Sequence, residues 1–385
     1  MWLATNLHHS LSIGKKLETF VGDSPSSQNL IFPEIYLEDG DKQKRINNIN
    51  QTMRNYLDNN MFDEIESLLL VDRVQSDGKH RLGLIISVDL EAYDYTPHNT
   101  ALVKATERTI IDRLPPRIEI RKDACLEIPH IMMLMDDVDN NILPTLYDQK
   151  DSFEQVYDFE LNMGGGRISA YKVPNGQGVL EAIESLAYPE VTKKKYGNVA
   201  PILFAVGDGN HSLATAKECW NNIKVSLTEK ERKNHKARFA LCELCNLHDS
   251  ALEFQPIHRV IKNADKHFIE FMQREVGGES CTKMVFEGVE YQLDISASAS
   301  DAIADLQKAI DDYTKENKQI VIDYIHGDDY LLEVAKDCGG VALFMPTLSK
   351  TSLFDYCARR GVLPRKSFSM GHAEDKRYYL ESKEI

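Results

Sequence analysis

The residues best suited to chemistry lie in one short turn, Gly207-Asp208-Gly209-Asn210-His211. The apolar run 201–206 before the turn predicts a strand buried on both sides, and the pattern of 212–221 after it predicts a helix. Glycines at such a turn allow positive φ angles and let a ligand approach the backbone closely. Unpaired amides at the start of the helix attract anions such as phosphate. The turn therefore predicts an anion-binding site.

The side chains of the turn suggest separate roles. Asp208 would repel a bare phosphate, so we expect it to act as a general base on a hydroxyl or as a ligand of a divalent metal ion. His211 can donate to a phosphate oxygen, and Asn210 and Ser212 can add neutral donors. The alternative is purely structural, because Asn210 or Ser212 can cap a helix and Gly and Asp are common in turns.

The spacing Gly207-x-Gly209-x-x-Ser212 also resembles a dinucleotide-binding fingerprint. The match is weak, because the third small residue is serine, the loop contains an aspartate, and no clear acidic strand end follows about 20 residues later. A dinucleotide-dependent oxidoreductase is therefore the least favoured interpretation of this turn.

Three clusters of polar residues lie beside turn-forming residues elsewhere in the chain. Arginine suits bidentate recognition of phosphate or carboxylate, and lysine supplies a point charge. Taken alone, each cluster is more typical of a solvated or salt-bridged surface. Glu107 could neutralise its neighbour Arg108 or act as a base. The candidate ligand contacts in these clusters are Arg113 and Arg117, then His258 and Arg259, then Arg365, Lys366 and Ser367.

The spacing Cys242-x-x-Cys245-x-x-His248 suggests a metal site. A single Cys-x-x-Cys without a second pair is poor evidence for a metal, and its neighbours are apolar. We therefore expect Cys242 and Cys245 to be buried core residues.

Composition limits the classes of function. The 385 residues carry 60 acidic and 45 basic side chains, for a formal net charge of −15, which argues against nucleic acid as a partner. No apolar stretch reaches the roughly 20 residues that a membrane span needs. Seven cysteines without a disulfide framework, and no signal-like run in the first twenty residues, predict a cytoplasmic protein.

The elements that must position these residues indicate an α/β fold (α+β mixed), with mixed parallel and antiparallel sheets and packed helices. Runs 68–74 and 82–88 around Asp77-Gly78 predict a hairpin. We expect helices at 46–59, 99–112, 130–137 and 177–187, the second of them ended by Pro115-Pro116. The division expected is an N-terminal irregular or helical extension, 1–62, a core with the phosphate site, 63–265, and a C-terminal α/β segment, 266–385. In that last segment we expect the hairpin 282–295, helices at 299–316, 328–337 and 352–360, and strands at 319–326 and 341–345.

Taken in order, the motifs resemble those of the domain of unknown function family 1015. They are Glu107-Arg108-Thr109 with Arg113 or Arg117, then Val206 to His211 with Ala214-Thr215-Ala216, then Pro256-x-His258-Arg259, then Pro364-x-Lys366-Ser367. The resemblance spans roughly 65–370. The turn of this family also resembles that of the ParB/sulfiredoxin-like fold, which includes enzymes that phosphorylate free serine.

This resemblance implies a ParB/sulfiredoxin-like core and transfer of a phosphoryl group from ATP or ADP, with Mg²⁺, to a small hydroxyl compound. Asp208 and His211 match the family's turn, and Glu107, Arg259 and Lys366 match its other polar positions. Asn210 and Ser212 stand where the family has a histidine and an arginine, and the first sixty residues differ from it. We expect a kinase for a small metabolite, possibly free serine. The alternatives are a regulatory protein that binds a nucleotide or anion without turnover, and the oxidoreductase.

Overall fold

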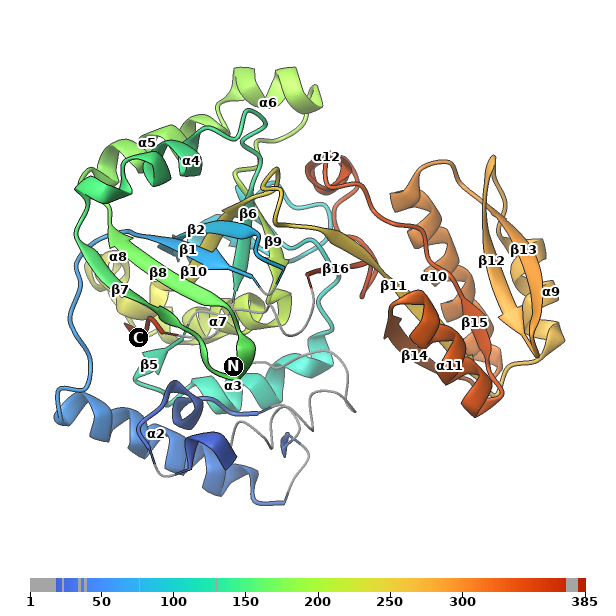
Figure 1. The fold of residues 1–385 in the computed structure, drawn as a ribbon, viewed down its shortest axis with the longest axis horizontal. Coiled ribbons are helices and arrows are strands. Elements are labelled where there is room, and N and C mark those ends of the chain that lie inside the picture. The colour runs from blue at the N-terminus through green and yellow to red at the C-terminus, as the bar shows by residue number, and fades with distance from the viewer. Residues whose placement is uncertain are drawn as a thin grey trace. The chain divides into compact units, whose positions relative to one another are not determined.

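The chain folds into two compact units in the computed structural model, which describes residues 19–22, 24–33, 36–37, 40–75, 77–128, 131–371 and 380–385. The first unit comprises Met1–Leu252 and His372–Ile385, and the second comprises Glu253–Gly371. The second unit is thus inserted between two segments of the first (Figure 1). The boundary expected from the sequence, after residue 265, falls inside this second unit.

A nine-stranded mixed sheet forms the first unit, which confirms the predicted fold class. Its order is β3-β4-β9-β6-β10-β2-β1-β8-β7. Strands β3, β4 and β9 run parallel to one another, β6 and β10 are also parallel, and the other neighbours pair antiparallel. The predicted hairpin is confirmed as β1 and β2. The strand bounds are β1 Leu69–Val74, β2 His80–Asp89, β3 Tyr93–Asp94, β4 Val103–Lys104, β6 Met132–Met135, β7 Gln155–Glu160, β8 Arg167–Lys172, β9 Phe204–Asp208 and β10 Phe239–Asn246.

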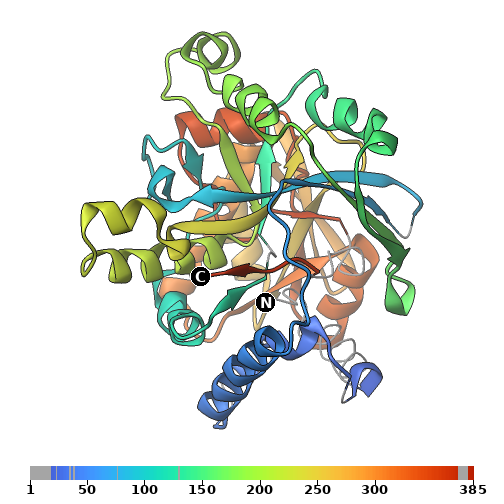
Figure 2. The same ribbon diagram turned by 90° about the vertical axis from the view of Figure 1, so that its left-hand side faces the viewer.

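Helices lie on both sides of this sheet. Figure 1 shows α4, α5 and α6 on one side and α3 and α7 on the other. The C-terminal strand β17 (Lys383–Glu384) pairs with β5 (Leu126–Glu127), so the end of the chain belongs to the first unit (Figure 2). The helix bounds are α2 Lys42–Asp58, α3 Leu114–Arg121, α4 Ile142–Asp148, α5 Gly176–Ser185, α6 Pro189–Tyr196, α7 Asn210–Lys224 and α8 Glu229–Asn234, with short 3-10 helices η1 Ser27–Leu30, η3 Leu90–Ala92, η4 Ile111–Arg113, η5 Lys150–Ser152, η6 Asn162–Gly164 and η7 Lys236–Arg238.

The second unit is built on a six-stranded antiparallel sheet in the order β13-β12-β15-β11-β14, with β16 also pairing with β11. Its core includes Val260, Leu331 and Ala342. The predicted hairpin about Gly288 and the alternation after residue 299 are confirmed. The bounds are β11 Phe254–Lys262, α9 Lys266–Glu275, β12 Ser280–Phe286, β13 Val289–Ile295, α10 Ala299–Glu316, β14 Val321–His326, α11 Asp328–Cys338, β15 Val341–Leu343, α12 Ser352–Arg359 and β16 Phe368–Met370.

Two expectations about local structure are wrong. The helix predicted at 99–112 is absent, because residues 103–104 form β4, and Pro115 and Pro116 occupy the first turn of α3 instead of ending a helix. Proline is compatible with a first turn, where its missing amide has no helical partner. The helix predicted at 130–137 is replaced by the buried strand β6, since periodicity does not separate a short apolar strand from a buried helix.

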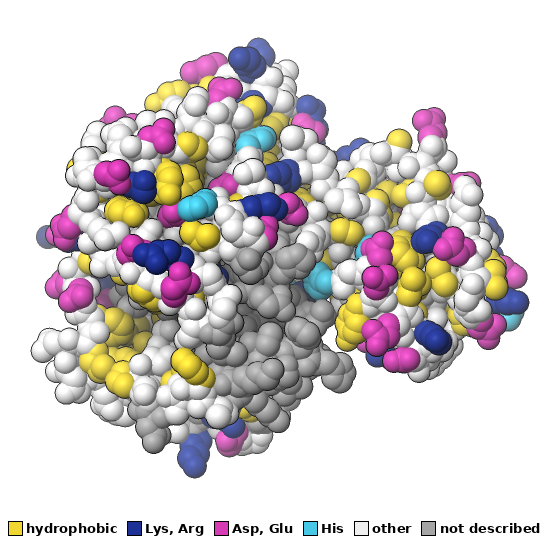
Figure 3. Space-filling model, in the orientation of Figure 1, with side chains coloured by type: hydrophobic (Ala, Val, Ile, Leu, Met, Phe, Trp, Pro, Cys, Tyr) yellow, Lys and Arg dark blue, Asp and Glu magenta, His cyan; other side chains and the backbone are white. Residues whose placement is uncertain are grey.

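On the face drawn in Figure 3, lysine and arginine side chains are interspersed with aspartate and glutamate and do not gather into one basic surface. Within the described residues, no helix is long and apolar enough to cross a membrane.

Candidate functional site

The predicted turn lies at the carboxyl end of β9. The strand ends at Asp208, Gly209 is the N-cap, and α7 begins at Asn210. Gly209 has φ 91° and ψ 22°, and a Cβ there would lie 3.1 Å from the Cα of Ile131. Glycine is therefore required at this position for both conformation and space. Gly207 lies within the strand, where the backbone is extended.

Asn210 connects the turn to the segment after β4. Its Oδ1 accepts a hydrogen bond from the Thr106 amide (3.1 Å), and its Nδ2 donates to Thr106 Oγ1 (3.2 Å). Thr106 Oγ1 in turn donates to the carbonyl of Val206 (2.6 Å). Gly209 is the N-cap of α7, and Asn210 is the first residue of the helix. The amide of Asn210 fixes one loop against the other, a relation that sequence spacing does not reveal.

His211 makes a second connection to the same segment. Its Nε2 accepts a hydrogen bond from the amide of Ile110 (3.2 Å). A ring nitrogen that accepts carries no proton, so this contact implies the neutral tautomer with its proton on Nδ1. Nε2 is thus engaged within the first unit, and the predicted phosphate contact of His211 stays a prediction.

Glu107 lies between these two connections. Thr106 is bound to Asn210 and Ile110 is bound to His211, so the backbone around Glu107 is held at both ends against the turn. Strands β4 and β9 are parallel and adjacent, and they deliver Glu107 and Asp208 to the same edge of the sheet. Ligands of α/β proteins bind at such carboxyl ends. Both carboxylate residues are partly exposed there.

Asp208 fits a metal site whose other ligands are phosphate oxygens and water better than one made of protein side chains alone. Its Oδ1 accepts a hydrogen bond from the amide of Gly209 (2.8 Å). Among the residues that the structure describes, no group of three or more His, Cys, Asp or Glu side chains could hold a metal ion. Mg²⁺ is usually bound through one or two carboxylates together with phosphate oxygens and water. One carboxylate at the turn therefore fits a magnesium ion that arrives with a nucleotide.

The two arginines predicted as ligand contacts, Arg113 and Arg117, differ in exposure. Arg113 is exposed in η4, whereas Arg117 on α3 is only 7% exposed and its NH1 donates to the carbonyl of Arg113 (2.7 Å). Helix α3 packs against α7, so both arginines belong to the same unit as the turn. Ser212 donates its amide to the Gly209 carbonyl (2.9 Å).

His258 is a buried structural residue of the second unit. Its Nδ1 accepts a hydrogen bond from the amide of Met345 (3.0 Å), and its Nε2 contacts Asp328 Oδ1 at 2.9 Å. Burial lowers the pKa of His258, and the attraction of Asp328 offsets only part of this effect. Both ring nitrogens are thus engaged within the second unit.

Arg259 is fully buried and organises the loop that carries Lys366. Its NH2 donates to the carbonyls of Arg365 (3.4 Å) and Lys366 (3.0 Å), and its Nε donates to Gln307 Oε1 (3.1 Å). The guanidinium also lies 4.5 Å from the centre of the Tyr324 ring. Its nitrogens therefore bind groups of the second unit, and the predicted phosphate contact of Arg259 stays a prediction.

The rest of that loop is also held locally. Arg365 Nε donates to the hydroxyl of Tyr324 (2.7 Å), and Ser367 Oγ donates to the Pro364 carbonyl (2.7 Å). Lys366 has a positive φ of 57° and is partly exposed. The structure thus brings together the predicted residues in two groups. Those of 107–117 and 207–212 lie in the first unit, and those of 258–259 and 365–367 lie in the second.

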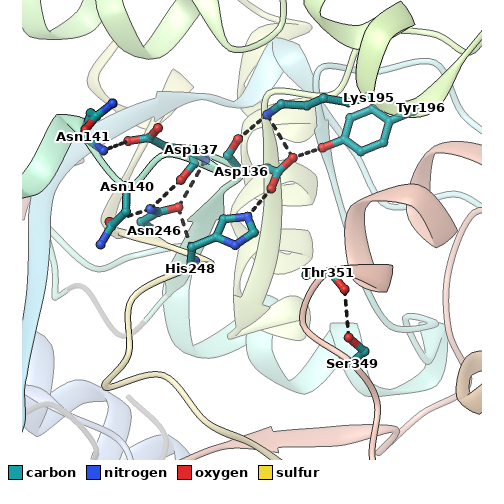
Figure 4. Close-up of polar contacts among 10 residues, drawn as sticks. All are labelled: Asp136, Asp137, Asn140, Asn141, Lys195, Tyr196, Asn246, His248, Ser349 and Thr351. Carbon is teal, nitrogen blue, oxygen red and sulfur yellow. Dashed lines mark hydrogen bonds and ion pairs between the residues drawn. The ribbon is translucent and has the colours of Figure 1, made fainter.

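Sequence reasoning missed a polar cluster at the carboxyl ends of β6 and β10 (Figure 4). Asp136 binds His248, Lys195 and Tyr196. Asp137 accepts from the amides of Asn141 and Ile142, at 2.8 Å each, and so holds the start of α4. The repeated acidic residues after an apolar run were the available signal. Cys242 and Cys245 are fully buried, which confirms the expected core cysteines.

A separate cavity of about 450 Å³ lies in the first unit between β3 and α7. It is lined by none of the predicted site residues. Of its lining residues, Tyr95 donates to Glu218 Oε1 (2.9 Å), and Lys217 donates to the carbonyl of Leu90 outside the cavity (2.8 Å).

Comparison with solved structures finds several distant matches. A conserved hypothetical protein from Pyrococcus furiosus is 10% identical with a TM-score of 0.39, covering 79% of this chain and 94% of that one. A free serine kinase variant in complex with AMP is 10% identical with a TM-score of 0.43, covering 78% and 92%. C-terminally truncated SbnI from Staphylococcus aureus is 9% identical with a TM-score of 0.40, covering 74% and 82%. No curated protein matches the chain.

Comparison with family models gives one match over nearly the whole chain. Residues 5–382 match the family described as "Protein of unknown function (DUF1015)". The match includes the turn at Asp208, the Glu107 segment and the loop of Lys366, and it agrees with the order of motifs in the sequence. The chain therefore belongs to the DUF1015 family.

Proposed function

We propose that this protein is a nucleotide-dependent phosphotransferase that acts on the hydroxyl group of a small metabolite in the cytoplasm. The supporting observation is the position of Glu107, held by the Thr106–Asn210 and Ile110–His211 hydrogen bonds against the turn of Asp208. Two carboxylates on adjacent loops, beside the start of helix α7, suit an acceptor hydroxyl next to a phosphate. Free serine is the first acceptor to test, because of the motif resemblance.

The reaction needs a base, a positioned donor and compensation of negative charge. Glu107 or Asp208 accepts the proton of the acceptor hydroxyl, whose oxygen then bonds to the terminal phosphorus of ATP or ADP. The bond to the leaving nucleotide breaks, and the nucleotide keeps the electron pair. Nδ1–H of His211 and the first amides of α7 donate to phosphate oxygens, where negative charge is concentrated.

Asp208 is the residue that would hold Mg²⁺, because one carboxylate beside a phosphate site matches how this ion is usually bound. When bound, the ion neutralises phosphate charge and orients the donor. If Asp208 is the metal ligand, Glu107 is the base. If Glu107 instead neutralises the charge of Arg108, then Asp208 is the base.

The proposal is tested by incubating the purified protein with ATP or ADP, Mg²⁺ and a panel of amino acids and other small hydroxyl compounds. Mass spectrometry should detect one phosphorylated acceptor, formed in proportion to the nucleotide consumed. Calorimetric titration with each nucleotide should show binding in the same preparation. Nucleotide binding without any phosphorylated product would exclude the kinase.

A second candidate is a regulatory protein that binds a nucleotide or anion without turnover. It is favoured by the engagement of Arg259 and His258 inside the second unit and by Ser212, which stands where the family has arginine. The same titration separates the candidates, because binding without product supports regulation and absence of binding removes both. Binding of NADH or NADPH, seen as a change in nicotinamide fluorescence, would instead support the oxidoreductase.

A further inference from the structure

A second group of reactive side chains lies at the opposite end of β6 from Asp208. Met132, the first residue of β6, pairs with Asp208, whereas Asp136 directly follows the last residue of that strand. Four residues of strand separate the two positions, roughly 13 Å. Strands β6 and β10 are parallel and end together, because Met135 pairs with Asn246. At this edge of the sheet, the carboxyl ends of two parallel strands therefore lie side by side. Ligands of α/β folds bind at such ends.

Asp136 is the centre of this group (Figure 4). Its Oδ1 lies 2.6 Å from His248 Nε2, and its Oδ2 accepts from Lys195 Nζ (3.0 Å) and from the hydroxyl of Tyr196. Burial would raise the pKa of Asp136, but the hydrogen bonds from Tyr196, His248 and Lys195 outweigh it and hold the pKa below its usual value. The carboxyl group is therefore ionised at neutral pH and is fixed from three sides.

His248 is oriented by this carboxylate. An ionised Asp136 beside Nε2 favours a proton on that nitrogen, which leaves the lone pair of a neutral ring on Nδ1. Among the residues that the structure describes, none forms a hydrogen bond to Nδ1. The His248 side chain is 18% exposed, so that a small molecule can reach it. The backbone is fixed as well, since the His248 amide contacts Asn246 Oδ1 at 3.4 Å.

We propose that Asp136 and His248 form a basic pair that takes a proton from the hydroxyl group of a small molecule bound at this edge. The O–H bond breaks, a new N–H bond forms at Nδ1, and the oxygen keeps the electron pair. Asp136 stabilises the resulting imidazolium, as a carboxylate does for a histidine base. The ligand class is thus a small hydroxyl compound, and water is its simplest member.

His80 provides a matched control on the same sheet. It also binds a buried carboxylate, with Nδ1 2.9 Å from Asp72 Oδ1, but its side chain is 52% exposed. Asp72 also accepts a hydrogen bond from the hydroxyl of Tyr147 (2.9 Å), and no lysine of the described residues binds it. His80 thus differs from His248 in its exposure, in the ring nitrogen that faces the carboxylate and in the lack of a lysine on that carboxylate.

The direct test uses p-nitrophenyl acetate as the probe, with water as the hydroxyl compound. His248 takes a proton from water, the water oxygen attacks the acyl carbon, and p-nitrophenolate leaves and is measured by absorbance. His248→Asn should lower the rate above background at least about tenfold, whereas His80→Asn should leave it unchanged. An equal rate in wild type and His248→Asn would overturn the proposal.

The second test begins with the wild-type protein, so its first readout does not require that a variant fold. ¹⁵N NMR of the wild-type protein should show the neutral His248 ring with its proton on Nε2 and none on Nδ1. In parallel, diethylpyrocarbonate should modify His248, and Asp136→Asn should slow that modification about tenfold without changing modification of His80. A proton on Nδ1 of the neutral ring, or a His248 that the reagent does not modify, contradicts the basic pair. None of these readouts uses a nucleotide, so failure here is distinct from failure of the kinase proposal.

Discussion

Asn210 and Thr106 lie 104 residues apart in the chain, yet both polar atoms of the Asn210 amide bind Thr106. Both side chains are buried, so this pair holds the Glu107 segment against the turn of Asp208. Asn210 thus connects two loops that are far apart in the chain.

Asn210→Ala should destabilise the protein and lower activity together. The substitution leaves the buried amide of Thr106 without its acceptor, at a cost of about 1–3 kcal/mol, while the Thr106 hydroxyl keeps its bond to the Val206 carbonyl. Urea unfolding measures the loss, and Asn221→Ala on the same helix, whose amide binds only the nearby Glu218, serves as the control. In a double-mutant cycle with Thr106→Val, additive effects would contradict a direct coupling.

Glu107→Gln and Asp208→Asn should separate the base from the metal ligand. Loss of the base lowers turnover about 10²–10⁴-fold with little change in nucleotide affinity. Loss of the metal ligand instead weakens magnesium-dependent nucleotide binding. Turnover assays and calorimetry with and without Mg²⁺ give the two quantities. If both variants keep wild-type turnover, neither carboxylate has the proposed role.

The sequence predicted helices and strands best where they depend on residues that are close together in the chain. The hairpin of β1 and β2 and the helix α10 follow from alternation and apolar periodicity, whereas Pro115 and Pro116 are compatible with both the end and the start of a helix. The turn at Gly209 was likewise recognisable, because a positive φ demands glycine.

Long-range contacts could not be predicted in this way. Nothing near Arg259 in the sequence indicates that it binds the carbonyl of Lys366, and nothing near Asp136 indicates Lys195 or His248 as its partners. Residue type suggested phosphate binding for Arg259, but the fold surrounds its guanidinium with carbonyl groups. Only the tertiary structure decides whether a polar residue faces a ligand or another part of the chain.

Arg259→Met should destabilise the second unit. The variant leaves the carbonyls of Arg365 and Lys366 without their donor and removes the contact with Tyr324. Because hydrogen bonds from a charged group contribute about 1.5–3 kcal/mol each, we expect a loss of about 3 kcal/mol. Hydrogen exchange should become faster in β11 and β14 and stay unchanged in β1 and β2. Unchanged protection of β11 would show that Arg259 is not structural.

Mild acid should destabilise the second unit through His258. Its folded-state pKa is lowered below the usual 6.5, so the unfolded chain binds the proton more readily. The stabilising contribution is present above pH 6.5 and is lost as the pH falls through the lowered value. His258→Asn, whose Oδ1 can still accept from the Met345 amide, should lack this part of the pH dependence. Urea unfolding at pH 7.5 and pH 5.5 measures it, and identical pH dependence in both proteins would contradict the assignment.

The central claim is that the turn of Asp208 supports phosphoryl transfer to a hydroxyl group. The most direct measurement is ³¹P NMR of the wild-type protein with ATP or ADP, Mg²⁺ and free serine, beside Asp208→Asn under the same conditions. The account predicts a phosphomonoester signal that grows as the nucleotide is consumed in wild type and is at least about 10²-fold slower in the variant. Nucleotide bound by the wild-type protein but no phosphomonoester, with serine or any other hydroxyl compound tested, would contradict it.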